Sequence, residues 1–283
     1  MAFIEKMKEW RKMTRYNLRC EKHFLKSQEI TLQKKIAFIF NKYYNILLKK
    51  ESIKYLNKIF YYDNRFVPAL LQLYPAEINE IGTKINLKTI STVLDIGANI
   101  GQWSYTLKSF FPHLKIYSFE PNKNIFNILK RNSSYFTEWK VYNCALGRKD
   151  SKKKLYYSPE ASAEGSFYKE NLYQNYRRKE IRETTINMIK LDKKKMQELK
   201  IPHKIDLLKI DVEGFEIEVL QSLRDIDFKY LSIEISLGRI GESSVGNIIL
   251  LIKKIFNKDA KILYYNIPDK ESLNANALFI LNN

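Results

Sequence analysis

The chain has 283 residues, of which 45% are hydrophobic and 13% aromatic, and its formal net charge is +18. This composition excludes a globally disordered chain, and the length fits one α/β domain with an added helical region. The charge is spread along the chain without an arginine-rich tract, and lysine far outnumbers arginine. We interpret the lysine excess as an AT-rich bacterial coding bias. The positive charge then favours an anionic small substrate, such as a nucleotide-sugar, over a nucleic-acid partner.

Cysteine content and hydropathy point to a cytoplasmic protein. Only Cys20 and Cys144 are present, too few for a disulfide framework or a zinc cluster. The amino-terminal residues alternate charged with apolar side chains and include no signal-peptide stretch. No run of about 18 apolar residues occurs, so no transmembrane helix is expected. Peripheral membrane attachment through the basic amino-terminal helices remains an alternative.

Residues 1–80 are interpreted as a helical accessory region. Neither Gly nor Pro occurs between Glu5 and Asn64. Apolar residues recur at a spacing that predicts amphipathic helices; they are Ile36, Ile39, Phe40, Tyr43 and Leu47, then Ile53, Leu56 and Phe60. These helices are expected to pack on the rest of the chain or to form a homodimer or partner surface, and they carry no recognisable chemistry. Pro68 and Pro75 mark the passage to the second region.

Residues 81–283 alternate β-rich and helical stretches. The β-rich runs are Thr92 to Gly97, Lys115 to Glu120, Lys140 to Leu146, Ile205 to Asp211, Tyr230 to Ser236, Lys261 to Ile267 and Ala277 to Leu281. The helical stretches are Gln102 to Phe110, Lys123 to Asn132, Glu216 to Leu223 and Ile248 to Phe256. This alternation predicts a Rossmann-like α/β fold, with a seven-stranded, mostly parallel sheet and an antiparallel final strand.

An insertion at about residues 151–204 interrupts the alternation. It is polar, with strand-like runs at Lys154 to Tyr157 and Thr184 to Leu191 and a flexible-looking run at Ser158 to Ser166. Long insertions in compact domains are commonly lids or binding loops. We expect this one either to cover a substrate, with Lys169, Arg177 and Arg178 available to hold a diphosphate, or to present an exposed charged helix.

A glycine-bearing turn follows the first β-rich run. In Asp95-Ile96-Gly97-Ala98-Asn99-Ile100-Gly101 the glycines let the backbone turn sharply and approach a ligand. We expect Asp95, Gly97, Asn99 and Gly101 to bind a nucleoside cofactor, with Asp95 organising the turn or meeting the ligand. A dinucleotide site is the alternative, although the Gly-x-x-x-Gly spacing departs from its usual pattern.

The next two runs end in further cofactor candidates. Glu120 lies about 20 residues after the turn, where a carboxylate accepts hydrogen bonds from ribose hydroxyls, and Pro121 ends its strand. Glu120 alone does not identify the cofactor, because an NAD enzyme has an acid at a comparable place. Asn143 and Ala145 are expected to flank an adenine. Cys144 is interpreted as a small core residue rather than a nucleophile.

The run Asp206 to Asp211 leads into Val212-Glu213-Gly214. Strand alternation places Lys209 and Asp211 on the same side, at the sheet edge where ligands bind. Buried charges are costly unless they are paired or used, so both side chains are functional candidates.

Together these motifs resemble the FkbM-type methyltransferases over about Thr89 to Leu281. The resemblance implies a class I methyltransferase fold, S-adenosylmethionine as methyl donor, and O-methylation of a hydroxyl, often on a sugar. Asp211, which also belongs to the cofactor set, is then the first candidate for the base, with Lys209 and Glu234 behind it. Asp211, Glu213 and Glu234 are able to hold a divalent metal, but no metal is assigned.

The acceptor is expected to be a sugar of a nucleotide-sugar or a surface-polysaccharide precursor. A polyketide or other secondary metabolite is the second interpretation. An RNA methyltransferase and a noncatalytic binding module are the remaining ones. His113 and His203, next to Pro112 and Pro202, are expected on the surface.

Overall fold

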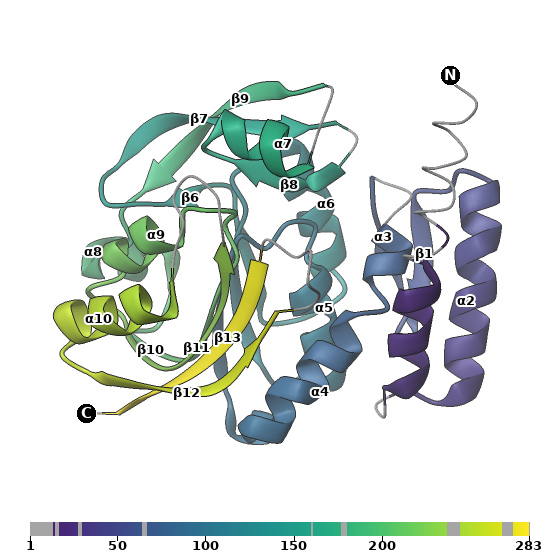
Figure 1. Cartoon of the computed structure of the whole chain (residues 1–283), viewed down its shortest axis with the longest axis horizontal. Helices are drawn as coiled ribbons and strands as arrows, with labels where there is room; N and C mark the ends of the chain where they lie inside the picture. The colour runs from purple at the N-terminus through teal and green to yellow at the C-terminus, as the bar shows by residue number, and fades with distance from the viewer. Residues whose placement is uncertain are drawn as a thin grey trace.

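The computed structural model (Figure 1) describes residues 14, 17–27, 30–63, 67–159, 161–176, 180–236, 244–267 and 274–282, without the side chains of residues 161–164, 173–176 and 236. A seven-stranded sheet forms its centre, in the order β12-β13-β11-β10-β3-β4-β5. Its strands are β3 (Thr92–Ile96), β4 (Lys115–Phe119), β5 (Trp139–Tyr142), β10 (Lys204–Ile210), β11 (Asp227–Ser236), β12 (Asp259–Asn266) and β13 (Asn274–Asn282). β11, β10, β3, β4 and β5 run parallel, and β13 pairs antiparallel with β11 and with β12. The predicted sheet is confirmed.

Helices cover both faces of the sheet (Figure 1). One face packs against α8 (Lys193–Leu199), α9 (Glu216–Ser222) and α10 (Val245–Phe256), and the other against α4 (Tyr74–Lys84), α5 (Gln102–Phe110) and α6 (Lys123–Ser133). Successive strand residues enter opposite cores: Val93 one and Leu94 the other, as do Leu207 and Leu208. This two-sided burial explains why the strands read as continuous apolar runs rather than alternating ones.

The amino-terminal region is helical in part. Residues 17–26 and α2 (Leu32–Leu47) are helices, followed by α3 (Val67–Leu70) and a short 3₁₀ turn, η1 (Leu87–Thr89). Residues 1–13 lie outside the described part of the chain. Among the described helices, none is both long enough and apolar enough to cross a membrane. The boundary expected at residue 80 falls inside α4.

The helix expected through Ile53, Leu56 and Phe60 is wrong. This segment is a hairpin of β1 (Ser52–Tyr55) and β2 (Lys58–Tyr61). Leu56 and Asn57 turn the chain with φ values of 46° and 71°, a left-handed conformation that two-residue hairpins require. Alternation then buries Ile53 and Tyr55, and the Phe60 ring packs edge-on against Tyr105 of α5 with centroids 4.9 Å apart.

The insertion forms its own small sheet above the carboxyl ends of the central strands (Figure 1). The order is β6-β9-β7-β8, with β6 (Ala145–Leu146), β7 (Ser151–Ser158), β8 (Ala161–Ser166) and β9 (Arg182–Ile189). Helix α7 (Lys169–Tyr176) follows β8. The run expected as one strand at Lys140 to Leu146 is thus divided: its first part extends the central sheet as β5, and its last two residues begin the insertion sheet as β6.

Candidate active site

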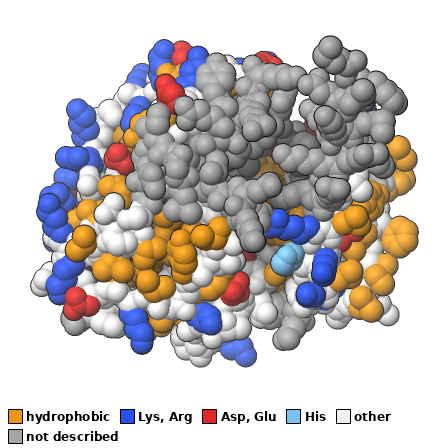
Figure 2. Space-filling model, in the orientation of Figure 1, with side chains coloured by type: hydrophobic (Ala, Val, Ile, Leu, Met, Phe, Trp, Pro, Cys, Tyr) orange, Lys and Arg blue, Asp and Glu red, His pale blue; other side chains and the backbone are white. Residues whose placement is uncertain are grey.

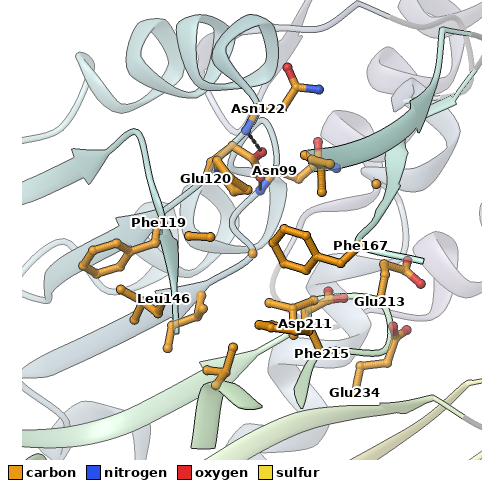
Figure 3. Close-up of a pocket in the computed structure, with 18 of the residues that line it drawn as sticks. Asn99, Phe119, Glu120, Asn122, Leu146, Phe167, Asp211, Glu213, Phe215 and Glu234 are labelled. Atoms are coloured by element: carbon orange, nitrogen blue, oxygen red, sulfur yellow. Dashed lines mark hydrogen bonds between the residues drawn. The ribbon is translucent and has the colours of Figure 1, made fainter. Parts of the chain in front are cut away.

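A cavity of about 280 Å³ opens at the carboxyl ends of β3, β4 and β10. Figure 3 shows Asn99, Glu120 and Asn122 on one side of it, Asp211, Glu213 and Glu234 on another, and Phe167 of the insertion between them. Leu70 and Tyr74 of the amino-terminal region also line it. The cavity is therefore built by three parts of the chain, of which the sequence had suggested two.

Gly97 joins the glycine turn directly to the end of β10. Its φ is 81°, and a Cβ at this position would lie 1.8 Å from the carbonyl oxygen of Asp211. The Asp211 amide in turn donates to the Ile96 carbonyl at 3.0 Å. Only glycine allows this backbone approach, so the two motifs recognised separately in the sequence form one unit.

The turn ends in two more left-handed residues. Asn99 has a φ of 52° and Gly101 a φ of 93°, immediately before α5 begins at Gln102. A Cβ on Gly101 would lie 2.8 Å from Leu129 and 3.0 Å from Trp139. Asn99 lines the cavity, whereas Gly101 is needed for the close packing beneath it.

Glu120 is buried and fixes the second strand to the turn. One carboxylate oxygen accepts from the Asn99 amide at 3.0 Å and the other from the Asn122 amide at 2.8 Å (Figure 3). Burial raises the pKa of Glu120 to about 7, against the lowering effect of these two amides. An ionised carboxylate has about four acceptor positions, so each oxygen keeps capacity for a ligand hydroxyl.

The segment after β5 was expected to flank an adenine through Asn143 and Ala145, but the Asn143 side chain binds the backbone instead. The Asn143 side chain donates to the carbonyls of Glu120 and Pro121, at 2.9 and 3.0 Å, and so holds the end of β4. Pro121 and Ala145 line the cavity, together with Cys144. Burial raises the pKa of the Cys144 thiol to about 12, in keeping with a packed residue rather than a nucleophile.

Asp95 lies beneath the cavity and is completely buried. Its carboxylate accepts from the hydroxyls of Ser104 and Ser118, at 2.6 and 3.4 Å. The Lys209 ammonium lies 3.7 Å from Asp95 and 3.0 Å from Asp211. Lys209 in β10 and Asp211, the residue after its end, therefore point to the same side, as strand alternation predicts, and Asp95 lies close to both.

Lys209 is surrounded by three acids. Burial alone would lower its pKa, but the carboxylates of Asp211, Asp95 and Glu77 raise it above the ordinary value. Burial conversely raises the pKa of Asp95, and Lys209 opposes that rise. Lys209 therefore stays charged and counters acids that would otherwise be unpaired in the core.

Glu77 is a site residue that the sequence analysis missed. It comes from α4, in the region to which no chemistry was assigned, and lines a second cavity of about 130 Å³ with Lys209, Asp211 and Glu234. Burial raises its pKa to about 7, while the nearby Lys209 lowers it. Nothing in the local sequence around Glu77 distinguishes it, because only the tertiary packing of α4 brings it to this edge.

The turn after β10 holds the insertion in place. Glu213 and Gly214 adopt φ values of 53° and 99°, and the Gly214 amide donates to the buried Glu216 carboxylate at 2.9 Å. The Ser166 hydroxyl of β8 donates to the Glu213 carbonyl at 3.1 Å. The Phe167 and Phe215 rings pack with centroids 4.5 Å apart. Burial raises the pKa of Glu216 to about 7. Its hydrogen bond to the Gly214 amide supports the turn, a role that the sequence analysis did not assign to it.

Carboxylate oxygens of Asp211, Glu213 and Glu234 converge to within 4.8 Å of one another. Oxygen donors of this kind suit hard divalent cations. Asp211 already has Lys209 as a counter-ion, which reduces the repulsion within the group. His113 and His203 are exposed, as expected; Lys169 is also exposed, and Arg177 and Arg178 lie outside the described residues.

Comparison with known proteins agrees with this geometry. The model of the methyltransferase FkbM domain matches residues 95–258. Methyltransferase 1 of Beauveria bassiana is 29% identical over 148 residues, covering 48% of this chain and 59% of that protein. Methyltransferase sdnD of Sordaria araneosa is 29% identical over 161 residues, covering 49% and 62%. The chain thus spans about three fifths of the length of these relatives.

Solved structures show a distant likeness in fold. Magnesium protoporphyrin IX methyltransferase from Synechocystis, solved with bound S-adenosylmethionine, is 11% identical with a TM-score of 0.46, covering 86% of this chain and 91% of that one. Fibrillarin of Aeropyrum pernix, also with bound S-adenosylmethionine, is 11% identical with a TM-score of 0.42, covering 69% of each chain. The family match covers more than half of the 283 residues. The chain belongs to the FkbM family of methyltransferases.

Proposed function

We propose that this protein is a cytoplasmic S-adenosylmethionine-dependent O-methyltransferase whose acceptor is a sugar hydroxyl, on a nucleotide-sugar or a surface-polysaccharide precursor. The observation that carries the proposal is the position of Asp211. Its carboxylate faces both cavities, one lined by the glycine turn and Glu120, the other by polar side chains. A base at that junction meets an acceptor hydroxyl beside the donor.

The residues of the larger cavity fit the donor. Glu120 retains acceptor capacity for two ribose hydroxyls, and Phe119, Ala145 and Leu146 supply an apolar wall for a purine. Gly97 leaves room for a ligand to approach the backbone of the turn. Bound S-adenosylmethionine supplies the electrophilic methyl group at this edge.

The chain's own contribution is to position the acceptor and remove its proton. Methyl transfer to a hydroxyl is fastest when the reacting atoms are held in line. In this proposal the walls of the cavity hold the acceptor in that position. Asp211 accepts the hydroxyl proton as attack proceeds. Lys209, 3.0 Å away, fixes the orientation of this carboxylate, and Glu234 lies within reach as a second acceptor.

The smaller cavity favours a polyhydroxylated acceptor. Oxygen-bearing side chains dominate its lining, with Lys209 as the only cation among the described lining residues; the lining residues are Tyr74, Glu77, Lys209, Ile210, Asp211, Ser232, Glu234 and Asn276. Carboxylates and amides of this kind accept hydrogen bonds from several hydroxyls of one sugar.

A secondary-metabolite acceptor is the second candidate, because one wall of the larger cavity is apolar. Leu70, Phe167, Val212 and Phe215 are among its lining residues, and apolar lining of this kind suits a substrate with a hydrophobic body. A sugar acceptor would contact the polar lining of the smaller cavity, whereas a secondary metabolite would contact the apolar lining of the larger one.

A panel assay distinguishes them. Release of S-adenosylhomocysteine is measured with nucleotide-linked sugars and with hydroxylated polyketides, for the native protein and for Asp211→Asn. We expect the native protein to turn over sugars, Asp211→Asn to lower that activity at least about a hundredfold, and EDTA to leave the native activity intact. Full activity of Asp211→Asn with the best acceptor would show that Asp211 is not the base, and turnover confined to polyketides would reject the sugar.

A further inference from the structure

Helix α2 buries its polar side and exposes its apolar side. The buried side chains are Lys35, Phe38, Lys42 and Asn45. Of the apolar residues expected to pack on the rest of the chain or to form a partner surface, Ile39 packs partly against the core, whereas Phe40 is 73% exposed and Leu47 79% exposed. The helix is therefore amphipathic, as predicted, but its apolar face lies on the outside of the protein.

Specific partners hold the helix in this orientation. The Lys42 ammonium donates to Glu21 at 2.5 Å and to Gln72 at 3.0 Å, and the Asn45 amide donates to the Ser52 carbonyl at 2.8 Å. Lys35 donates to the carbonyls of Leu25 and Ser27. Rotating the helix to bury its apolar face would strand these buried polar groups, and each such group is costly to leave unpaired.

The exposed residues form one stripe along the whole helix. At 3.6 residues per turn they fall within about 120° of one another, opposite the buried side; they are Leu32, Ile36, Phe40, Tyr43, Tyr44 and Leu47. Figure 2 shows hydrophobic side chains gathered at the edge of the molecule where Figure 1 places α2, beside a group of Lys and Arg side chains.

The exposed charges on and beside α2 are predominantly basic, and Glu51, which directly follows Lys50, is the exposed acid among the described residues next to the helix. Every exposed charged residue of the described stretches 17–27 and 30–50 is basic; these are Arg19, Lys22, Lys26, Lys34, Lys49 and Lys50. The acid described in these stretches, Glu21, is bound to Lys42. Lys50 also lies over the ring of Tyr44, with its ammonium 4.9 Å from the ring centroid, so positive charge directly adjoins the apolar stripe.

We infer that α2 is an interfacial helix that docks the protein on an anionic lipid bilayer. Apolar side chains on one face, tyrosines among them, with six exposed basic residues against the single exposed acid Glu51 in the described stretches 17–27 and 30–51, are what the boundary of a charged membrane accepts. A second copy of the chain fits less well, because an isologous contact through the stripe would bring the basic margins together. Docking of this kind would bring the enzyme to acceptors carried at the membrane, independently of which hydroxyl it methylates.

Vesicle flotation of the full-length protein tests the inference. Binding is expected with vesicles of phosphatidylcholine and phosphatidylglycerol, to be much weaker with phosphatidylcholine alone, and to fall when salt shortens the Debye length from about 10 to about 3 Å. The double variant Phe40→Ser/Leu47→Ser is expected to lower the partition coefficient by at least about tenfold. Lys49→Gln/Lys50→Gln is expected to lower it about 25-fold on the anionic vesicles, about fivefold per charge.

Leu250→Ser is the matched control. Leu250 is 70% exposed on α10, at the opposite end of the molecule from α2, and its loss should leave binding unchanged. The native protein failing to float, or all variants floating equally, would overturn the inference. Light scattering that shows a dimer disrupted by Phe40→Ser/Leu47→Ser, without vesicle binding, would assign the stripe to a second copy instead.

Discussion

Replacing Lys209 with methionine should destabilise the protein strongly, and more so as the pH rises. The substitution keeps an unbranched side chain one atom shorter than lysine but leaves Asp95 without its cation. Asp95 is completely buried and lies 3.7 Å from the ammonium, which at an effective dielectric constant of about 20 corresponds to an attraction of about 4 kcal/mol. Breaking a buried pair typically costs about 3–5 kcal/mol. The side chain of Asp211 is 38% exposed and adds little to this figure.

The pH dependence follows from proton binding. Burial already raises the pKa of Asp95, and removing Lys209 raises it further. The folded protein then keeps the Asp95 proton to a higher pH than the unfolded chain does. Its free energy of unfolding therefore falls as the pH rises from the pKa of Asp95 in the unfolded chain, about 4, through its pKa in the folded protein. Lys209→Met should therefore be closest to the native protein in acid and furthest from it in mildly alkaline buffer.

Urea denaturation from about pH 5 to about pH 8 measures both effects. A double-mutant cycle with Asp95→Asn provides the control, because Lys209→Met should cost much less where Asp95 carries no charge. If Lys209→Met costs less than about 1 kcal/mol, or if its cost is the same in the Asp95→Asn background, Lys209 does not neutralise Asp95.

Three further predictions concern the site. Glu120→Gln should weaken S-adenosylmethionine binding measured by calorimetry. The affinity of the native protein should fall about tenfold from pH 8 to pH 6, because protonation of Glu120 near its pKa of about 7 removes an acceptor of ribose hydroxyls. Asp211→Asn should lower kcat at least about a hundredfold with little change in donor affinity, as loss of a general base does. Gly97→Ala should lower Tm sharply and abolish donor binding, because its Cβ would lie 1.8 Å from a backbone oxygen in a left-handed conformation.

Each of these has its own control. The affinity of Glu120→Gln should not vary with pH in that range, and a persisting slope would assign the titration to another group. Donor binding lost together with kcat in Asp211→Asn would make this residue part of the donor site instead of the base. Gly82→Ala, inside α4 with 3.4 Å to its nearest neighbour, should keep or raise Tm. A normal Tm for Gly97→Ala would show that the turn can move away from β10.

The central sheet could be predicted because its local and global signals agree. Strands buried on both faces read as apolar runs, and Gly101 marks the start of α5 where it was expected. The pairing of Lys209 with Asp211 followed from strand alternation alone. By contrast, the hairpin at Ser52–Tyr61 was misassigned because Ile53, Leu56 and Phe60 also satisfy a helical spacing, so the turn at Asn57 was not recognised.

The orientation of α2 and the role of Glu77 could not have been predicted in the same way. Periodicity identifies an amphipathic helix but assumes that its apolar face is the buried one. Here Lys42 and Asn45 find partners inside, and those of Lys42, Glu21 and Gln72, lie 21 and 30 residues away in the sequence. Glu77 similarly acquires its importance from Lys209, more than 130 residues later in the chain.

Helix α4 has a practical consequence for anyone who prepares a shortened protein. The family match starts at residue 95, which invites expression of the matched segment alone. Such a fragment would lose Tyr74 and Glu77 from the lining of the smaller cavity, and it would expose to water the α5 surface on which Tyr55 and Phe60 now pack. Activity measured on that fragment would describe an enzyme with a wider mouth and one fewer negative charge beside Lys209. Acceptor screens should therefore use a chain that retains everything from the first described helix onward.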